Sequence, residues 1–254
     1  MDFSVKNDIA QVLAKFPWVK PENYTKLVSN VLNSTAYHVG KNLQAQMDKD
    51  FDRPTPFAKR APYAWRSKPD NLEAGVRIRD FAVKGSPAIK YLGPQIYGGT
   101  RSLKGSEKAL RAAGLLPNDL FIVPAQGAPL DQYGNLRPSY VNTILSYLRA
   151  NRDSTQNRAV QGKAKRMQFF AVSEAGRLPL GIYERKGGTI RMVIAFVKEP
   201  NYKKRYKFFE TAQDFTRTYF MDKLRREAEY MTRTQGARFE REILNSVGDL
   251  FNNG

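Results

Sequence analysis

The sequence predicts an α+β protein: a small, mostly antiparallel β-sheet packed by long N-terminal and C-terminal helices, with an inserted mixed α/β region in the middle. Apolar residues recur at helical spacing near both ends, and β-branched and aromatic runs lie between them. Two such runs flank Gly187 and Gly188, a pair typical of a tight hairpin turn because glycine accepts positive φ. We predict three segments: 1–84, 85–166 and 167–254.

The N-terminal segment begins with two predicted amphipathic helices. The first covers 3–16 and ends before Pro17, and the second runs from about 22 to 47 with one apolar stripe for a sheet or a partner. His38 lies at the margin of this stripe without a second metal-binding residue at i+4, so we interpret it as a packing residue.

Residues 50–69 combine prolines with aromatic side chains, and predict an extended, irregular arm. Such an arm could grip a neighbouring subunit, while a plain surface loop with tucked aromatic rings is the alternative. The candidate contact residues are Phe51, Phe57, Tyr63 and Trp65. A half-buried strand with one basic face is predicted next, from Gly75 to Val83.

The middle segment resembles an insert or a lid. Its predicted elements are a turn at 97–99, a helix over 107–113 capped by Ser106, a strand over 121–123 and a helix over 139–149. Residues 151–166 then form a basic linker or exposed loop. Its candidate contact residues are Arg152, Arg158, Lys163, Lys165 and Arg166.

The C-terminal segment begins with a predicted strand over 167–173 and the hairpin strands 180–185 and 189–197. A basic loop follows, and two helices are expected after it, one from about 206 to 231 and one beyond Gly236. The loop's cations are Lys198, Lys203, Lys204, Arg205 and Lys207, interleaved with Tyr202 and Tyr206.

The composition favours a polyanionic partner. Forty-two Lys and Arg against 24 Asp and Glu give a net charge of +18, which suits nucleic acid or an acidic protein surface. The absence of cysteine excludes disulfides and thiolate metal sites, and a single His excludes a His-rich metal site. No signal peptide is expected, and the longest apolar run, Val193–Val197, is far shorter than the roughly 20 residues of a membrane helix.

One pattern suggests catalysis. Glu184 and Lys186 share a strand face, as in metal-dependent nucleases, but that chemistry also needs another acidic ligand, for which Glu174 or Asp70 can only be nominated. We favour a surface ion pair beside a turn and keep a nuclease using Glu184 and Lys186 as a minor alternative. Neither a P-loop nor a GxGxxG motif is present. The sequence therefore predicts no enzyme, no cofactor and no metal site.

The basic loop could follow a phosphate backbone while its tyrosines stack on bases. A solvated loop at a helix N-terminus is the alternative, although cations there oppose the helix dipole. This unfavourable placement suggests that an external anion or an acidic partner compensates the charge.

Two segments in order, LPLGIYER (178–185) and IAFVKEPNYKKRYKFF (194–209), resemble the C-terminal core of the minor tail protein Z, or tail-completion, family of tailed bacteriophages. The stretch VLNSTAYHVGKNLQAQM (31–47) resembles that family's N-terminal helix. Two further stretches, YGGTRSLKGSEKALRAAGLLP and VPAQGAPLDQYGNL, are similar to an insert of longer phage versions. These motifs are structural, and their order carries the resemblance.

The resemblance implies a structural virion protein of the neck or upper tail, assembled in the host cytoplasm. Its subunits would form a homo-oligomeric ring, six- or twelve-fold, at the head–tail junction around the DNA channel, and complete the tail. The implied partners are neighbouring connector, tail-terminator or tube proteins and viral DNA, with no membrane. A sequence-independent DNA-binding protein acting outside a virion is the alternative.

Overall fold

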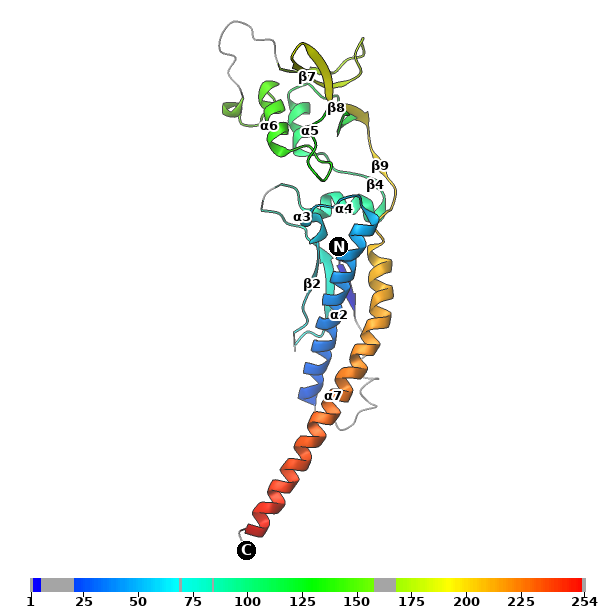
Figure 1. The fold of residues 1–254 in the computed structure, drawn as a ribbon, viewed down its shortest axis with the longest axis vertical. Coiled ribbons are helices and arrows are strands. Elements are labelled where there is room, and N and C mark those ends of the chain that lie inside the picture. Colours follow the sequence, from blue (N-terminus) through cyan, green and yellow to red (C-terminus); the bar gives the residue numbers. More distant parts are fainter. Residues whose placement is uncertain (1, 6–20, 69, 84, 158–167, 253–254) are drawn as a thin grey trace. The chain divides into compact units, whose positions relative to one another are not determined.

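The computed structural model describes residues 2–5, 21–68, 70–83, 85–157 and 168–252 (Figure 1). The chain forms two compact units: unit 1 holds residues 1–49, 56–89 and 207–254, and unit 2 holds residues 50–55 and 90–206. The α+β class is confirmed. The boundary between the two units falls inside the predicted segment 167–254, because the hairpin belongs to unit 2 and the C-terminal helix belongs to unit 1.

Unit 1 is built on an antiparallel sheet in the order β1-β3-β2 (β1 Asp2–Val5, β3 Ala74–Ile78, β2 Pro62–Trp65). Val76 of β3 lies opposite Phe3 on one side and Ala64 on the other. Helix α2 (Pro21–Asp50) buries the predicted apolar stripe. The unit's core cluster combines α2, β3 and the C-terminal helix through Leu27, Val28, Val31, Leu32, Ala36, Ala74, Phe220 and Leu224.

The C-terminal region forms one helix, α7 (Phe208–Asn252), of 45 residues, roughly 67 Å long at 1.5 Å per residue. The prediction of two helices separated near Gly236 is therefore wrong. A single glycine costs a helix interior roughly 1 kcal/mol relative to alanine but does not end it, and no proline follows in this region. Figure 1 shows α7 beside α2, within unit 1.

Two N-terminal predictions also fail. Residues 2–5 form a strand rather than the start of a helix over 3–16, because they pair with β3; residues 6–16 lie outside the described residues. The arm is not irregular throughout, since it contains α3 (Pro56–Lys59) and β2. Pro56 and Pro62 each occupy the first position of their element, where the missing amide proton costs little.

Unit 2 contains a four-stranded antiparallel sheet in the order β5-β8-β7-β6 (β5 Leu120–Pro124, β8 Thr189–Lys198, β7 Gly181–Lys186, β6 Phe169–Val172). The predicted hairpin is confirmed, with positive φ at Gly187 (58°) and Gly188 (84°). Helices α5 (Gly105–Ala112) and α6 (Pro138–Tyr147) contribute Leu110, Ile144 and Leu145 to the core against this sheet. A short 3₁₀ helix (Ser154–Gln156) follows α6.

Three further elements were not expected from the sequence. Helix α4 (Ala88–Tyr97) contains Pro94, which lowers its helix propensity, and the strands β4 (Gly99–Thr100) and β9 (Asn201–Tyr202) are too short to show an alternating pattern. β4 and β9 pair with each other, although about one hundred residues separate them in the chain. This pairing fixes the start of the basic loop.

Candidate interaction surface

The basic segment, defined as residues 198–207, has a well-held backbone. Asn201 and Tyr202 pair with β4, and the backbone N–H groups of Arg205 and Tyr206 both donate to the carbonyl oxygen of Gln95, at 2.8 and 2.9 Å. Gly98 adopts φ +81°, which favours glycine, and a Cβ there would lie in tight contact with the Tyr202 carbonyl oxygen, at 3.3 Å. The candidate cations are all exposed: Lys198, Lys203, Lys204, Arg205 and Lys207.

The two tyrosines of the basic segment do not share this exposure. Tyr206 is fully buried, and its ring centroid lies 5.8 Å from that of Phe51. Burial raises the pKa of Tyr206 well above its usual range. The expectation that Tyr206 stacks on bases is therefore wrong, because its ring is buried and packs near Phe51. Tyr202 is half-buried in β9.

Lys207 is the last residue before α7, so it alone of the five cations adjoins the helix N-terminus. Glu210 lies in the first turn of α7 and supplies a negative charge at the same end. Lys207 is therefore the only one of the five cations that is placed to oppose the dipole of α7. Of the remaining cations, Lys198 is the last residue of β8, and Lys203, Lys204 and Arg205 follow β9.

The positive charge is concentrated in unit 2. This unit holds 21 of the 42 Lys and Arg residues but only 9 of the 24 Asp and Glu residues, so it carries +12 of the net +18. Arg152, from the predicted basic linker, is exposed. Arg158, Lys163, Lys165 and Arg166 lie outside the described residues. Unit 2 is thus the part of the chain best suited to a polyanion.

The candidate arm residues occupy different environments. Phe51 is half-buried against Tyr206 in unit 2, whereas Phe57 of α3 is 45% exposed. Tyr63 and Trp65 are half-buried on β2, and each ring lies 5.5 Å from a guanidinium carbon, of Arg79 and Arg77 respectively. The structure therefore does not bring these four aromatic residues together as one contact surface.

Glu184 is 4% exposed and lies at the centre of a hydrogen-bonded network. Its carboxylate accepts bonds from the Arg191 guanidinium at 2.6 and 2.9 Å, from Tyr140 Oη at 3.3 Å and from Gln168 Nε2 at 3.2 Å. Burial alone would raise the pKa of Glu184, but the hydrogen bonds from Arg191 and Gln168 outweigh it and lower that pKa. Lys186 is exposed two residues further along β7.

This network engages both carboxylate oxygens of Glu184 with protein donors. The predicted surface ion pair between Glu184 and Lys186 is therefore wrong: Glu184 is buried, and its cation is Arg191 of β8. Within the described ranges, no three Asp, Glu or His side chains gather in an arrangement that could hold a metal ion. The geometry around Glu184 accordingly favours a structural role.

The strand predicted from Gly75 to Val83 is longer than the strand in the structure, β3. β3 ends at Ile78, because its partner β2 begins only at Pro62, which lies opposite Ile78. Arg79 still donates its N–H to the Ala61 carbonyl oxygen, but residues 80–83 belong to no strand, and Phe81 and Val83 are 60% and 94% exposed. The sequence did not predict the exposed surface of Phe81 and Val83. The proline at position 62 was the one signal in the sequence that the pairing of β2 with β3 ends near Ile78.

No family model, curated protein or solved structure matches this chain. None of the helices in the described part of the chain has the length and apolar character needed to cross a membrane.

The structural role of Glu184 can be measured. Glu184→Gln leaves Arg191 without its charged partner, so we expect the free energy of unfolding to fall by about 1–2 kcal/mol in thermal or urea denaturation. The control Lys186→Gln changes an exposed side chain and should stay within about 0.5 kcal/mol of the wild type. Unchanged stability of Glu184→Gln, or loss of a magnesium-dependent DNA cleavage in both variants, would contradict this role.

Proposed function

We propose that this chain is a structural protein of a tailed-phage virion, a tail-completion or neck component that forms a ring at the head–tail junction. The observation that carries the proposal is the role of the motif residues in the fold. Two segments resemble the tail-completion family, LPLGIYER and IAFVKEPNYKKRYKFF. They supply buried residues of β7, of β8 and of the stretch that connects β8 to the start of α7.

The individual contacts explain these motif positions. Gly181 has no room for a side chain, since a Cβ would lie 2.4 Å from the Ile194 carbonyl oxygen. Tyr183 donates its hydroxyl to the Pro179 carbonyl at 2.8 Å. Tyr206 and Phe208, at the end of the second segment, are fully buried. A motif composed of such residues preserves an architecture, which suits a scaffold that is repeated in an assembly.

The charge distribution supports a place near DNA. Unit 2 carries +12, and the exposed cations of the basic segment project from a backbone that β4 and Gln95 hold in place. A six- or twelve-fold ring would multiply that charge around a central channel or against an acidic neighbouring ring. Connector, tail-terminator and tube proteins are the neighbours that this position implies.

A deletion mutant tests the proposed position in assembly. Electron microscopy of its lysate should show filled heads beside unattached, otherwise normal tails, because the joining component is missing. Expression of the protein from a plasmid should restore complete particles. Normal infectious particles from the deletion mutant would refute the proposal.

The charge of unit 2 also favours a second candidate, a sequence-independent DNA-binding protein that acts outside the virion. Duplex DNA binding by the purified protein should then weaken steeply with salt. The fourfold change of Lys198, Lys203, Lys204 and Arg205 to Gln should reduce the slope of log K against log salt by about 0.9 for each phosphate that the variant no longer neutralises.

A matched control removes four other exposed charges, with Lys26, Lys49, Lys68 and Lys90 changed to Gln. This control should keep the wild-type slope. An equal reduction of the slope in the two fourfold variants would show that the basic segment is not the binding surface.

A further inference from the structure

Strand β2 lies at an edge of the unit 1 sheet, because the strand order is β1-β3-β2. The Arg79 N–H donates to the Ala61 carbonyl oxygen at 3.0 Å, so the backbone groups of residue 61 point toward β3. Backbone groups alternate in direction along an antiparallel strand. The N–H and C=O of Ala64, three residues further on, therefore point away from β3.

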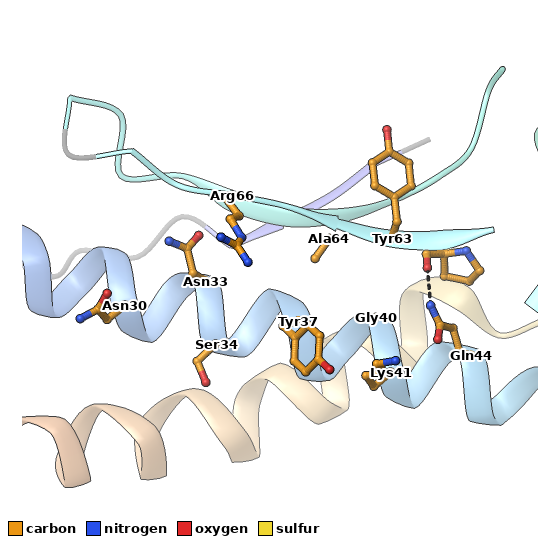
Figure 2. A pocket seen from close by; sticks show the side chains of 11 residues that line it. Asn30, Asn33, Ser34, Tyr37, Gly40, Lys41, Gln44, Tyr63, Ala64 and Arg66 are labelled. Carbon is orange, nitrogen blue, oxygen red and sulfur yellow. Dashed lines mark hydrogen bonds between the residues drawn. The ribbon is translucent and has the colours of Figure 1, made fainter. Parts of the chain in front are cut away.

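Two side chains of helix α2 form hydrogen bonds with the backbone on either side of this edge. Gln44 Nε2 donates to the Pro62 carbonyl oxygen at 2.9 Å, and Asn33 Oδ1 accepts from the Ser67 N–H at 2.7 Å. The stretch between these two contacts borders a groove of about 530 Å³ between α2 and β2, which Figure 2 shows with its lining side chains. Its lining includes the cations Lys41 and Arg66 and no carboxylate.

The same unit contains a segment outside any strand, residues 80–83, that suits such an edge. After β3, residues 80–83 belong to no helix or strand and make no backbone hydrogen bond among the described residues. Phe81 and Val83, two residues apart, are strongly exposed, and Asp80 is exposed beside them. An edge strand with outward backbone groups and a segment that exposes apolar side chains at alternate residues are complementary features.

We propose that residues 80–83 of one copy of this chain pair antiparallel with β2 of a second copy, with Ala82 opposite Ala64. Four residues on each side span roughly 13 Å at 3.3 Å per residue, so the two segments match in length. This register brings the backbone groups of Ala64 and Ala82 together as a hydrogen-bonded pair.

The side chains agree with this register. It places Asp80 opposite Arg66, a cation of the groove lining. It also places Val83 opposite Tyr63 and Phe81 opposite Trp65, which are favourable aromatic and β-branched pairs across neighbouring strands. The two surfaces of the contact, β2 and residues 80–83, are different parts of the chain. Each copy can therefore bind one neighbour through β2 and another through residues 80–83, and such head-to-tail contacts generate rings. The inference thus rests on the proposed ring and names its subunit contact.

A cross-linking experiment on the full chain tests the contact, and the absence of native cysteine makes it clean. In the double variant Arg66→Cys with Asp80→Cys, oxidation should join neighbouring copies, and a non-reducing gel should show a ladder of covalent oligomers. Each single variant should give dimers at most. The control pair Arg66→Cys with Asp222→Cys, also exposed in unit 1, should give no ladder.

Native mass spectrometry of the same proteins separates the two claims. Oligomers in the wild type without a ladder in the double variant would overturn the proposed contact and leave the ring intact. A wild-type chain that stays monomeric at all concentrations would overturn both.

The variant Ala64→Pro provides a second test without cysteine chemistry. It removes the outward N–H of Ala64 and leaves the pairing with β3 intact, because edge strands tolerate proline where the amide faces outward. We expect an unchanged circular dichroism spectrum and loss of the oligomer in native mass spectrometry. A folded Ala64→Pro variant with the wild-type oligomer would contradict the proposal.

Discussion

Unit 1 depends on the packing of α2 between the sheet and α7. Burial of each Leu or Val side chain on the α2 stripe contributes about 1.5–3 kcal/mol, and Leu27, Val31 and Leu32 are all at least 97% buried. The same helix positions polar groups on its flank. Gln44 bonds to Pro62 at the start of β2 and Asn33 to Ser67, two residues beyond its end, so the packing that stabilises the unit also shapes the groove at the sheet edge.

Unit 2 places its charges differently. Two carboxylates are buried, and each is held by an arginine and further donors. Glu107 is fully buried between Arg101, at 2.8 Å, and the backbone N–H groups of Lys104 and Ile122. Burial alone would raise the pKa of Glu107, but these donors lower it below its usual range. Because these two acidic side chains are buried and paired, the charged groups on the surface of unit 2 are mainly cations.

Long and strongly periodic features could be predicted from the sequence. The α2 stripe and the hairpin at Gly187 and Gly188 follow from local spacing and from the backbone freedom of glycine. Features that depend on distant partners could not. Residues 2–5 form a strand only because β3 lies beside them, and β3 stops at Ile78 because β2 begins at Pro62.

The same distinction applies to the candidate surfaces. The exposed cations of the basic segment were predictable, since runs of lysine and arginine favour solvent. The burial of Tyr206 was not, because it depends on Phe51, which lies more than 150 residues earlier in the chain. Arg191 as the partner of Glu184 required the register of β7 with β8. The exposure of Phe81 and Val83 became clear only when the end of the sheet was known.

These observations combine into one account. Interior residues of both units occupy the positions of the motifs on which the proposed resemblance rests, while exposed cations and the edge of β2 are the surfaces that we propose for contacts outside the chain. The most direct test of a place in the virion is immunogold electron microscopy of intact particles, with an antibody raised against the purified protein. The account predicts gold particles at the head–tail junction. Virions that carry no label, from which the protein is also absent by mass spectrometry, would contradict it.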